Sequence, residues 1–122
     1  MDSPRPPGIT TIDTGVLLSI ARLTTLAIPG VSRMGEVPGS VRGFFHQRGH
    51  DQGVRVEVKN SKVDVDVYVI FHKDTDIRAT SRQIQHEIAR AIFDMVGMEI
   101  GQINIHIDDI DYPPEAESPA EK

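Results

Sequence analysis

Two histidines at helical spacing are the first residues in this chain whose pattern suggests chemistry. His46 and His50 have the i,i+4 spacing of paired metal ligands on a helix, and Asp51 follows directly. Gly43 and Gly49 disfavour a helix in this stretch, and no third ligand is evident nearby. We therefore expect neither a metal site nor another cofactor.

Carboxylates also cluster, in groups that acid–base catalysis or cation binding would require. Asp64 and Asp66 alternate with valines, so both project from one face of an expected strand, which we predict to be solvated. A second cluster, Asp108, Asp109 and Asp111, lacks the EF-hand pattern. No serine lies in a nucleophile elbow, and no glycine-rich phosphate loop joins a strand to a helix. These residues predict a protein that is not an enzyme.

A third candidate site mixes basic and aromatic side chains, as sites for single-stranded nucleic acid do. It falls in and beside a glycine-rich stretch, 35–53, which we expect to be a long loop with a short extended piece at about 41–46. The mixture consists of Arg33, Arg42, Phe44, Phe45 and Arg48. The alternative, which we favour, is an insertion whose phenylalanines cover the core. The formal net charge of −5 also disfavours a nucleic-acid partner.

Length and composition predict one small domain. The chain has 122 residues, of which 39% are hydrophobic, enough for a single core. It has no cysteine, which excludes disulfides and fits a reducing cytoplasm. It shows neither a signal peptide nor an apolar run long enough to span a bilayer, so we expect any membrane association to come through a partner. Proline-rich and acidic ends predict disordered tails at 1–11 and 113–122 around a domain at 12–112.

Two segments of alternating apolar and polar residues predict the strands. The first runs from Lys62 to Phe71, and a turn at 60–61 would pair it with the preceding segment. In that register apolar residues meet on one face: Val54 with Val67, Val56 with Val65 and Val58 with Val63. On the other face Arg55 meets Asp66. The second alternating segment, about 99–111, predicts a strand that buries Ile103, Ile105 and Ile107.

Helical spacing of apolar residues flanks the strand pair. We expect one helix at about 14–28, ended by Pro29 and Gly30, and another that Asp74 or Asp76 caps and Gly97 ends. The first core stripe comprises Val16, Leu17, Ile20, Ala21, Leu23, Ala27 and Ile28. The second comprises Ile77, Ile84, Ile88, Ala91, Ile92 and Met95. The first helix is apolar on other sides too, which leaves open whether it lies inside the domain or meets a partner.

The resulting order is α-β-β-α-β, an α+β fold with two helices packed on one face of a small three-stranded sheet. The sheet can be mixed or antiparallel, and its strand order stays open. A KH-like RNA-binding module has a loosely similar order. Its GXXG loop joins two helices, whereas Gly97 to Gly101 has the wrong spacing and joins a helix to a strand. RNA binding is therefore the alternative function.

Three large side chains are candidates for a self-association surface. Tyr68 and Ile70 lie on the strand face opposite the valines, and Phe93 lies at the edge of the second helix's core stripe. Exposed apolar patches of this kind commonly mark protein interfaces. We expect all three to be exposed in a single subunit and to meet in a homo-oligomer, although the long loop could instead cover the strand face.

Five segments resemble the bacterial alkaline shock protein 23 family, also called envelope stress response proteins. They are 28–31 (Ile-Pro-Gly-Val), 53–56 (Gly-Val-Arg-Val), 63–71, 84–98 and 102–107. The resemblance implies a cytoplasmic, non-enzymatic protein that self-associates, supports the cell envelope under stress and reaches the membrane through a small membrane-anchored partner. It carries over no catalytic residues. The 35–53 segment is longer and richer in glycine than the family pattern, so the resemblance assigns that loop no role.

Overall fold

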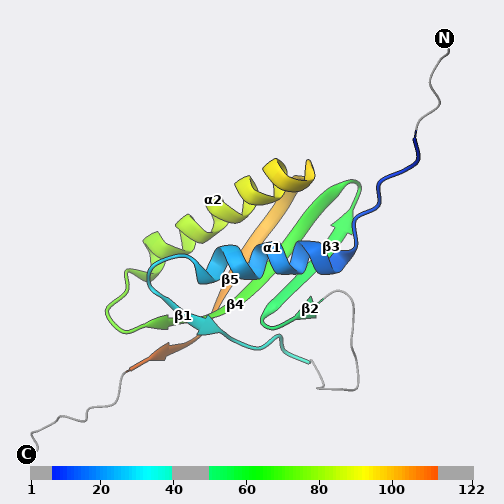
Figure 1. Ribbon diagram of the computed structural model, residues 1–122. Helices are drawn as coiled ribbons and strands as arrows, with labels where there is room; N and C mark the ends of the chain where they lie inside the picture. The colour runs from blue at the N-terminus through cyan, green and yellow to red at the C-terminus, as the bar shows by residue number, and fades with distance from the viewer. Residues whose placement is uncertain (1–6, 40–49, 113–122) are drawn as a thin grey trace, which may run out of the picture.

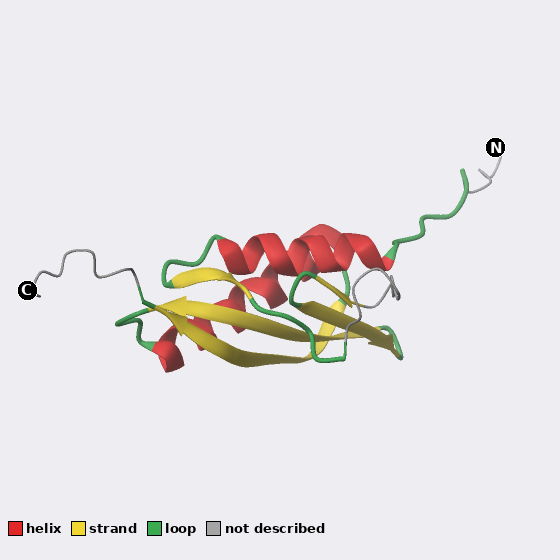
Figure 2. Ribbon diagram, turned by 90° about the horizontal axis from the view of Figure 1, so that it is seen from below, coloured by secondary structure: helices red, strands yellow, loops and turns green. Residues whose placement is uncertain are grey.

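A computed structural model describes residues 7–39 and 50–112, which form two helices and one five-stranded sheet (Figure 1). The elements are α1 (Thr14–Leu26), β1 (Val31–Met34), β2 (His50–Asp51), β3 (Val54–Lys59), β4 (Lys62–His72), α2 (Ile77–Val96) and β5 (Glu99–Asp111). Buried residues of both helices belong to one core cluster with β3 and β4, and Figure 2 shows α1 lying over the strands. The predicted α+β class is confirmed, with β1 and β2 as two short strands that the periodicity did not reveal.

Strand β4 is the centre of the sheet, because three other strands pair with it. β3 pairs antiparallel in the predicted register, with Val56 opposite Val65 and Arg55 opposite Asp66. β1 is also antiparallel to β4, whereas β5 is parallel to it. The sheet is therefore mixed, and β5 lies on the opposite side of β4 from β1 and β3.

Strands β1 and β3 meet end to end along the same edge of β4. At their junction the Tyr68 carbonyl accepts a 2.7 Å hydrogen bond from the Gly35 N–H, and the Tyr68 N–H donates one of 2.7 Å to the Gly53 carbonyl. Gly53 has φ of 82°, and a Cβ there would lie 2.8 Å from the Gly35 carbonyl oxygen. Only glycine fits this junction without strain.

Capping groups define both helices. The Asp13 carboxylate accepts a hydrogen bond from the Gly15 N–H at the start of α1, and Asp76 accepts one from the Ala79 N–H at the start of α2. Gly97 ends α2 in the left-handed conformation, with φ of 78°. These ends follow the polar and glycine signals in the sequence, although α1 ends two residues earlier than expected, at Leu26.

The core lies between the helices and the valine face of β4. The β4 residues on this face, Val63, Val65, Val67, Val69 and Phe71, are all fully buried. They belong to one cluster with Leu17 and Ala21 of α1 and Ile84, Ile88 and Ile92 of α2. This arrangement buries the inner face that the alternation predicts.

The outer face of β4 departs from the sequence prediction. Tyr68 and Ile70 are only 9% and 7% exposed, so the expectation that they stay exposed in a single subunit is wrong. Beyond β1 the Glu36 N–H bonds to the carboxylate of Asp108 on β5, 3.0 Å away, so the chain is tied across β4. Val37 is buried as well, at 6%, although it lies outside the core cluster. A contact between distant segments thus covers side chains that strand alternation alone would leave exposed.

Candidate interaction surface

The three residues predicted for self-association do not form one surface. Tyr68 and Ile70 are buried on the outer face of the sheet. Phe93 is 58% exposed on α2, which covers the opposite face. Of the three predicted residues, only Phe93 is exposed and can contact a partner protein.

The predicted nucleic-acid residues are only partly described. Arg42, Phe44, Phe45 and Arg48 lie outside the described residues. Arg33 is exposed, but its Nε lies 3.5 Å from a carboxylate oxygen of Asp111. Its charge is therefore already paired. Of the histidine pair, His46 is outside the described residues and His50 lies in β2; the described part of the chain holds no group of three side chains that could bind a metal.

A polar cluster joins β3, β4 and β5 on the outer face of the sheet. Asp66 is at its centre, with His106 Nε2 at 3.0 Å and Asn104 Nδ2 at 3.1 Å from its Oδ1. The predicted partner Arg55 lies 3.8 Å from its other oxygen. The Tyr68 ring stacks on His106, with 4.3 Å between centroids. Because every member bonds or packs against another, the cluster links the three strands through their side chains. We call such a set of side-chain contacts between strands a clasp.

Asp111 forms a second clasp, between the end of β5 and β1. Its carboxylate accepts a 2.6 Å hydrogen bond from the Ser32 hydroxyl and lies near the Arg33 guanidinium. The Ser32 hydrogen bond, with help from the Arg33 charge, lowers the pKa of Asp111 below its usual 3.8. The carboxylate is thus held in its charged form, which suits a structural tie.

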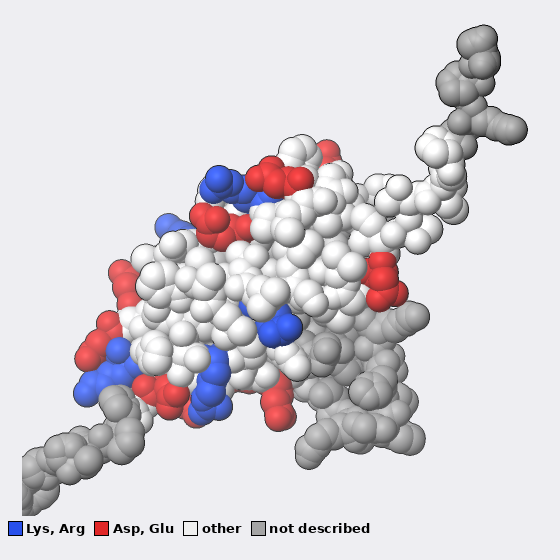
Figure 3. Space-filling view, viewed as in Figure 1, with Lys and Arg blue, Asp and Glu red and all other residues white. Residues whose placement is uncertain are grey.

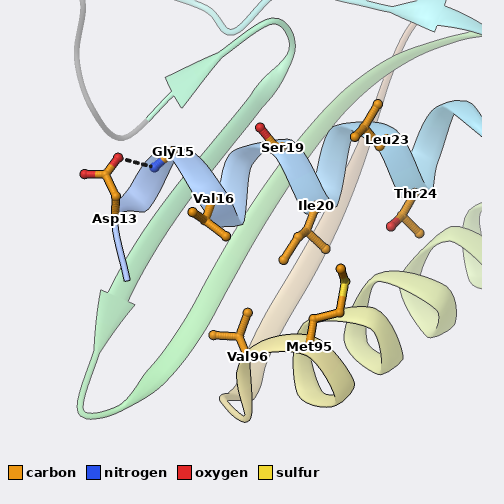
Figure 4. A pocket seen from close by; sticks show the side chains of 9 residues that line it. All are labelled: Asp13, Gly15, Val16, Ser19, Ile20, Leu23, Thr24, Met95 and Val96. Carbon is orange, nitrogen blue, oxygen red and sulfur yellow. Dashed lines mark hydrogen bonds between the residues drawn. The ribbon is translucent and has the colours of Figure 1, made fainter. Parts of the chain in front are cut away.

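A largely apolar groove of about 810 Å³ lies between α1 and the end of α2 (Figure 4). Val16, Ile20 and Leu23 line it from α1, and Met95 and Val96 from α2. In Figure 4 the Met95 side chain points across the gap toward α1. The groove can therefore receive an apolar side chain or helix from outside.

Sequence reasoning misplaced the residues of this groove. It assigned Val16, Leu23 and Met95 to core stripes, yet they are 46%, 57% and 70% exposed. The available signal was that α1 is apolar on several sides, with Arg22 as its only charged residue. In the space-filling view, charged side chains lie mostly toward the margin of this face, and a broad area of uncharged side chains, interrupted by a basic one, covers its middle (Figure 3). None of the described helices is both long and apolar enough to cross a membrane.

Comparisons with known proteins point the same way as the sequence resemblance. Residues 3–112 match the alkaline shock protein 23 family, described as having a cell envelope-related function. The uncharacterized protein YqhY of Bacillus subtilis strain 168 is 27% identical over 103 residues, which cover 84% of this chain and 76% of YqhY.

Among solved structures, the chain resembles variants of the MamM CTD. Two of them share 8% identity with it, with TM-scores of 0.48 and 0.49. The likeness covers 78% and 80% of this chain and 95% and 96% of those chains. These values describe a partial likeness in backbone arrangement and say nothing of ligands or partners.

Proposed function

Because this chain belongs to the alkaline shock protein 23 family, we propose that it is a non-enzymatic scaffolding protein that supports the cell envelope under stress. It works in the cytoplasm near the membrane, by self-association and by binding a small membrane-anchored partner. The observation that carries the proposal is the largely apolar groove between α1 and α2, with Leu23 and Met95 exposed at its rim. Apolar surface of this kind marks a site of protein contact.

The chemistry of the groove favours an apolar helix as the part of the partner that binds. Val16, Leu23 and Met95 offer apolar contacts, and the groove lies between two helices, where a third helix can pack its side chains. Among the described residues, Asp13 is the only ionisable one that lines it. Charge pairing therefore contributes little to recognition, and burial of apolar surface supplies most of the affinity.

Membrane recruitment of the full-length chain in its native cell tests this function. The double variant Leu23→Glu/Met95→Lys places charges in the groove at positions that are already exposed, so the fold should survive. We expect the wild type to be recovered with membranes and the double variant to remain in the supernatant.

The matched control is Val58→Glu. Val58 is 46% exposed near the turn that joins β3 to β4, and it is not among the residues that line the groove. This variant should behave as the wild type. Equal recovery of the wild type and the groove variant with membranes would exclude the groove as the docking site. Absence of the wild type from membranes under envelope stress would contradict the proposed function itself.

A further inference from the structure

Strand β5 has one edge with no partner strand among the described residues. It is 13 residues long and pairs with β4 on one side only. Its sequence contains no lysine, arginine or proline, the residues that commonly protect a sheet edge from pairing with another chain. A long edge of this type is a template for an added strand.

The ladder with β4 determines which backbone groups of β5 point to the free edge. Tyr68 directs its N–H and C=O toward β3 and β1, so by alternation Val67 and Val69 direct theirs toward β5. Val67 is opposite Ile105, and in a parallel ladder it bonds to the residues on either side of its partner. Ile105 and its alternate neighbours therefore point their N–H and C=O groups to the free edge.

A side-chain contact supports this assignment. Gln85 of α2 donates a 3.0 Å hydrogen bond to the Ile103 carbonyl, which is reachable because it faces away from β4. No corresponding bond is made by Ile105 or Ile107 at this edge within the described chain. Ile107 is also 42% exposed, whereas its partner Val69 is fully buried.

The free edge is regular only over 103–107. Irregular pairing with β4 interrupts β5 on both sides, between Ile100 and Ile103 and again between Ile107 and Asp109. Between these points the sequence reads Ile-Asn-Ile-His-Ile, with apolar residues at each end and in the middle. Asn104 Nδ2 and His106 Nε2 both bond to the Asp66 carboxylate, which fixes these two side chains on the outer face.

We infer that this edge pairs with the same edge of a second copy, as a two-fold symmetric antiparallel strand pair centred on Ile105. This deepens the proposed self-association and rests on it. In that register Ile105 meets its own copy, Ile103 meets Ile107, and Asn104 meets His106. Apolar residues face apolar ones and no like charges are opposed, as a self-complementary interface requires.

The exposed Phe93 lies on the side of α2 that borders this edge. At about 100° per residue, it is about 80° around the helix from Gln85, which contacts β5. Glu87, Arg90 and Asp94 instead line a second hollow, which α1 borders on the other side of α2. A second copy added at β5 therefore brings its own α2 toward Phe93, in keeping with the predicted role of this residue in self-association.

The variant Ile105→Pro tests the inference, because its proline removes an N–H that faces the free edge and not β4. The control Ile105→Ala also loses the isoleucine side chain but keeps the N–H. We expect the wild type to be a dimer by light scattering. Ile105→Pro should raise the dissociation constant about 100-fold, and Ile105→Ala should raise it less than about tenfold.

A second variant covers the case in which the proline unfolds the chain. Ile107→Lys puts a charge at a half-exposed edge position and should also yield folded monomers, as judged by circular dichroism. A monomeric wild type, or variants that dimerise as the wild type does, would overturn the edge pairing. Membrane recruitment is measured separately, with the variant Leu23→Glu/Met95→Lys. If the edge pairing is disproved, the proposed function is therefore still tested by that experiment.

Discussion

The two faces of β4 are buried by different means. On the inner face, valines and Phe71 alternate along the strand and meet the apolar stripes of α1 and α2. On the outer face, Tyr68 and Ile70 are buried beside the carboxylates Asp64 and Asp66. Here a tie from β1 to Asp111 of β5, and another from Glu36 just after β1 to Asp108, bring a remote segment across the strand. The inner face is thus specified by local pattern, whereas the outer face depends on contacts between distant segments.

A charge on the inner face should have the largest effect. Val67→Asp buries an unpaired carboxylate where the wild-type side chain is fully buried, which costs about 4 kcal/mol or more. We expect loss of the cooperative thermal transition measured by circular dichroism. Val58→Asp is the control, because Val58 lies on the same face of the sheet but is 46% exposed. Equal effects at the two positions would show that burial does not distinguish them.

The double variant Tyr68→Glu/Ile70→Lys tests whether the outer face is truly closed. Both side chains are buried, and Tyr68 also stacks on His106, so we expect a loss of about 4 kcal/mol in urea unfolding. The control Phe93→Glu changes an exposed residue and should cost less than about 0.5 kcal/mol. A double variant as stable as the wild type would mean that these positions are open in solution.

Substitution of Gly53 tests the junction where β1 and β3 meet along the edge of β4. Gly53→Ala adds a Cβ that meets backbone oxygens at 2.8 and 2.9 Å in a left-handed conformation, so we expect a loss of about 3 kcal/mol. Gly39→Ala is matched, because Gly39 has φ of 83° with nothing near its Cβ position; it should cost about 1 kcal/mol. Urea midpoints that coincide would exclude steric crowding as the reason for glycine at 53.

The smallest effect is expected at the Asp111 clasp and depends on pH. The folded pKa of Asp111 lies below the unfolded value, chiefly because of the Ser32 hydrogen bond. Its contribution is therefore complete above about pH 4 and is lost as pH falls through the lowered pKa. Asp111→Asn should lower the thermal midpoint slightly at pH 7 and converge with the wild type in acid. Asp109→Asn is the control. If the thermal midpoints of Asp111→Asn and the wild type differed by the same amount at every pH, the lowered pKa of Asp111 would not contribute to stability.

Much of the scaffold follows from short-range signals. Asp76 and Gly97 predict the ends of α2, and the alternation on both sides of the 60–61 turn predicts the register of β3 and β4. A slip of one residue would turn every valine to the wrong face, so pattern alone selects the pairing. The same short-range signals did not predict the groove between α1 and α2. A helix as apolar as α1 does not reveal that Leu17 and Leu18 are buried while Leu23 is exposed.

By itself the sequence determined the α+β class, the start of α1, both ends of α2, the hairpin register and the inner core, because capping, turns and alternation act between residues that are near in the chain. Only the tertiary structure decided that β5 runs parallel to β4, that β1 joins the sheet, and that Tyr68 and Ile70 are covered. Those outcomes rest on bonds such as Ser32 to Asp111, 79 residues apart, and Glu36 to Asp108, 72 residues apart. No local pattern encodes contacts over such separations, since each forms only after the sheet has brought its two segments together.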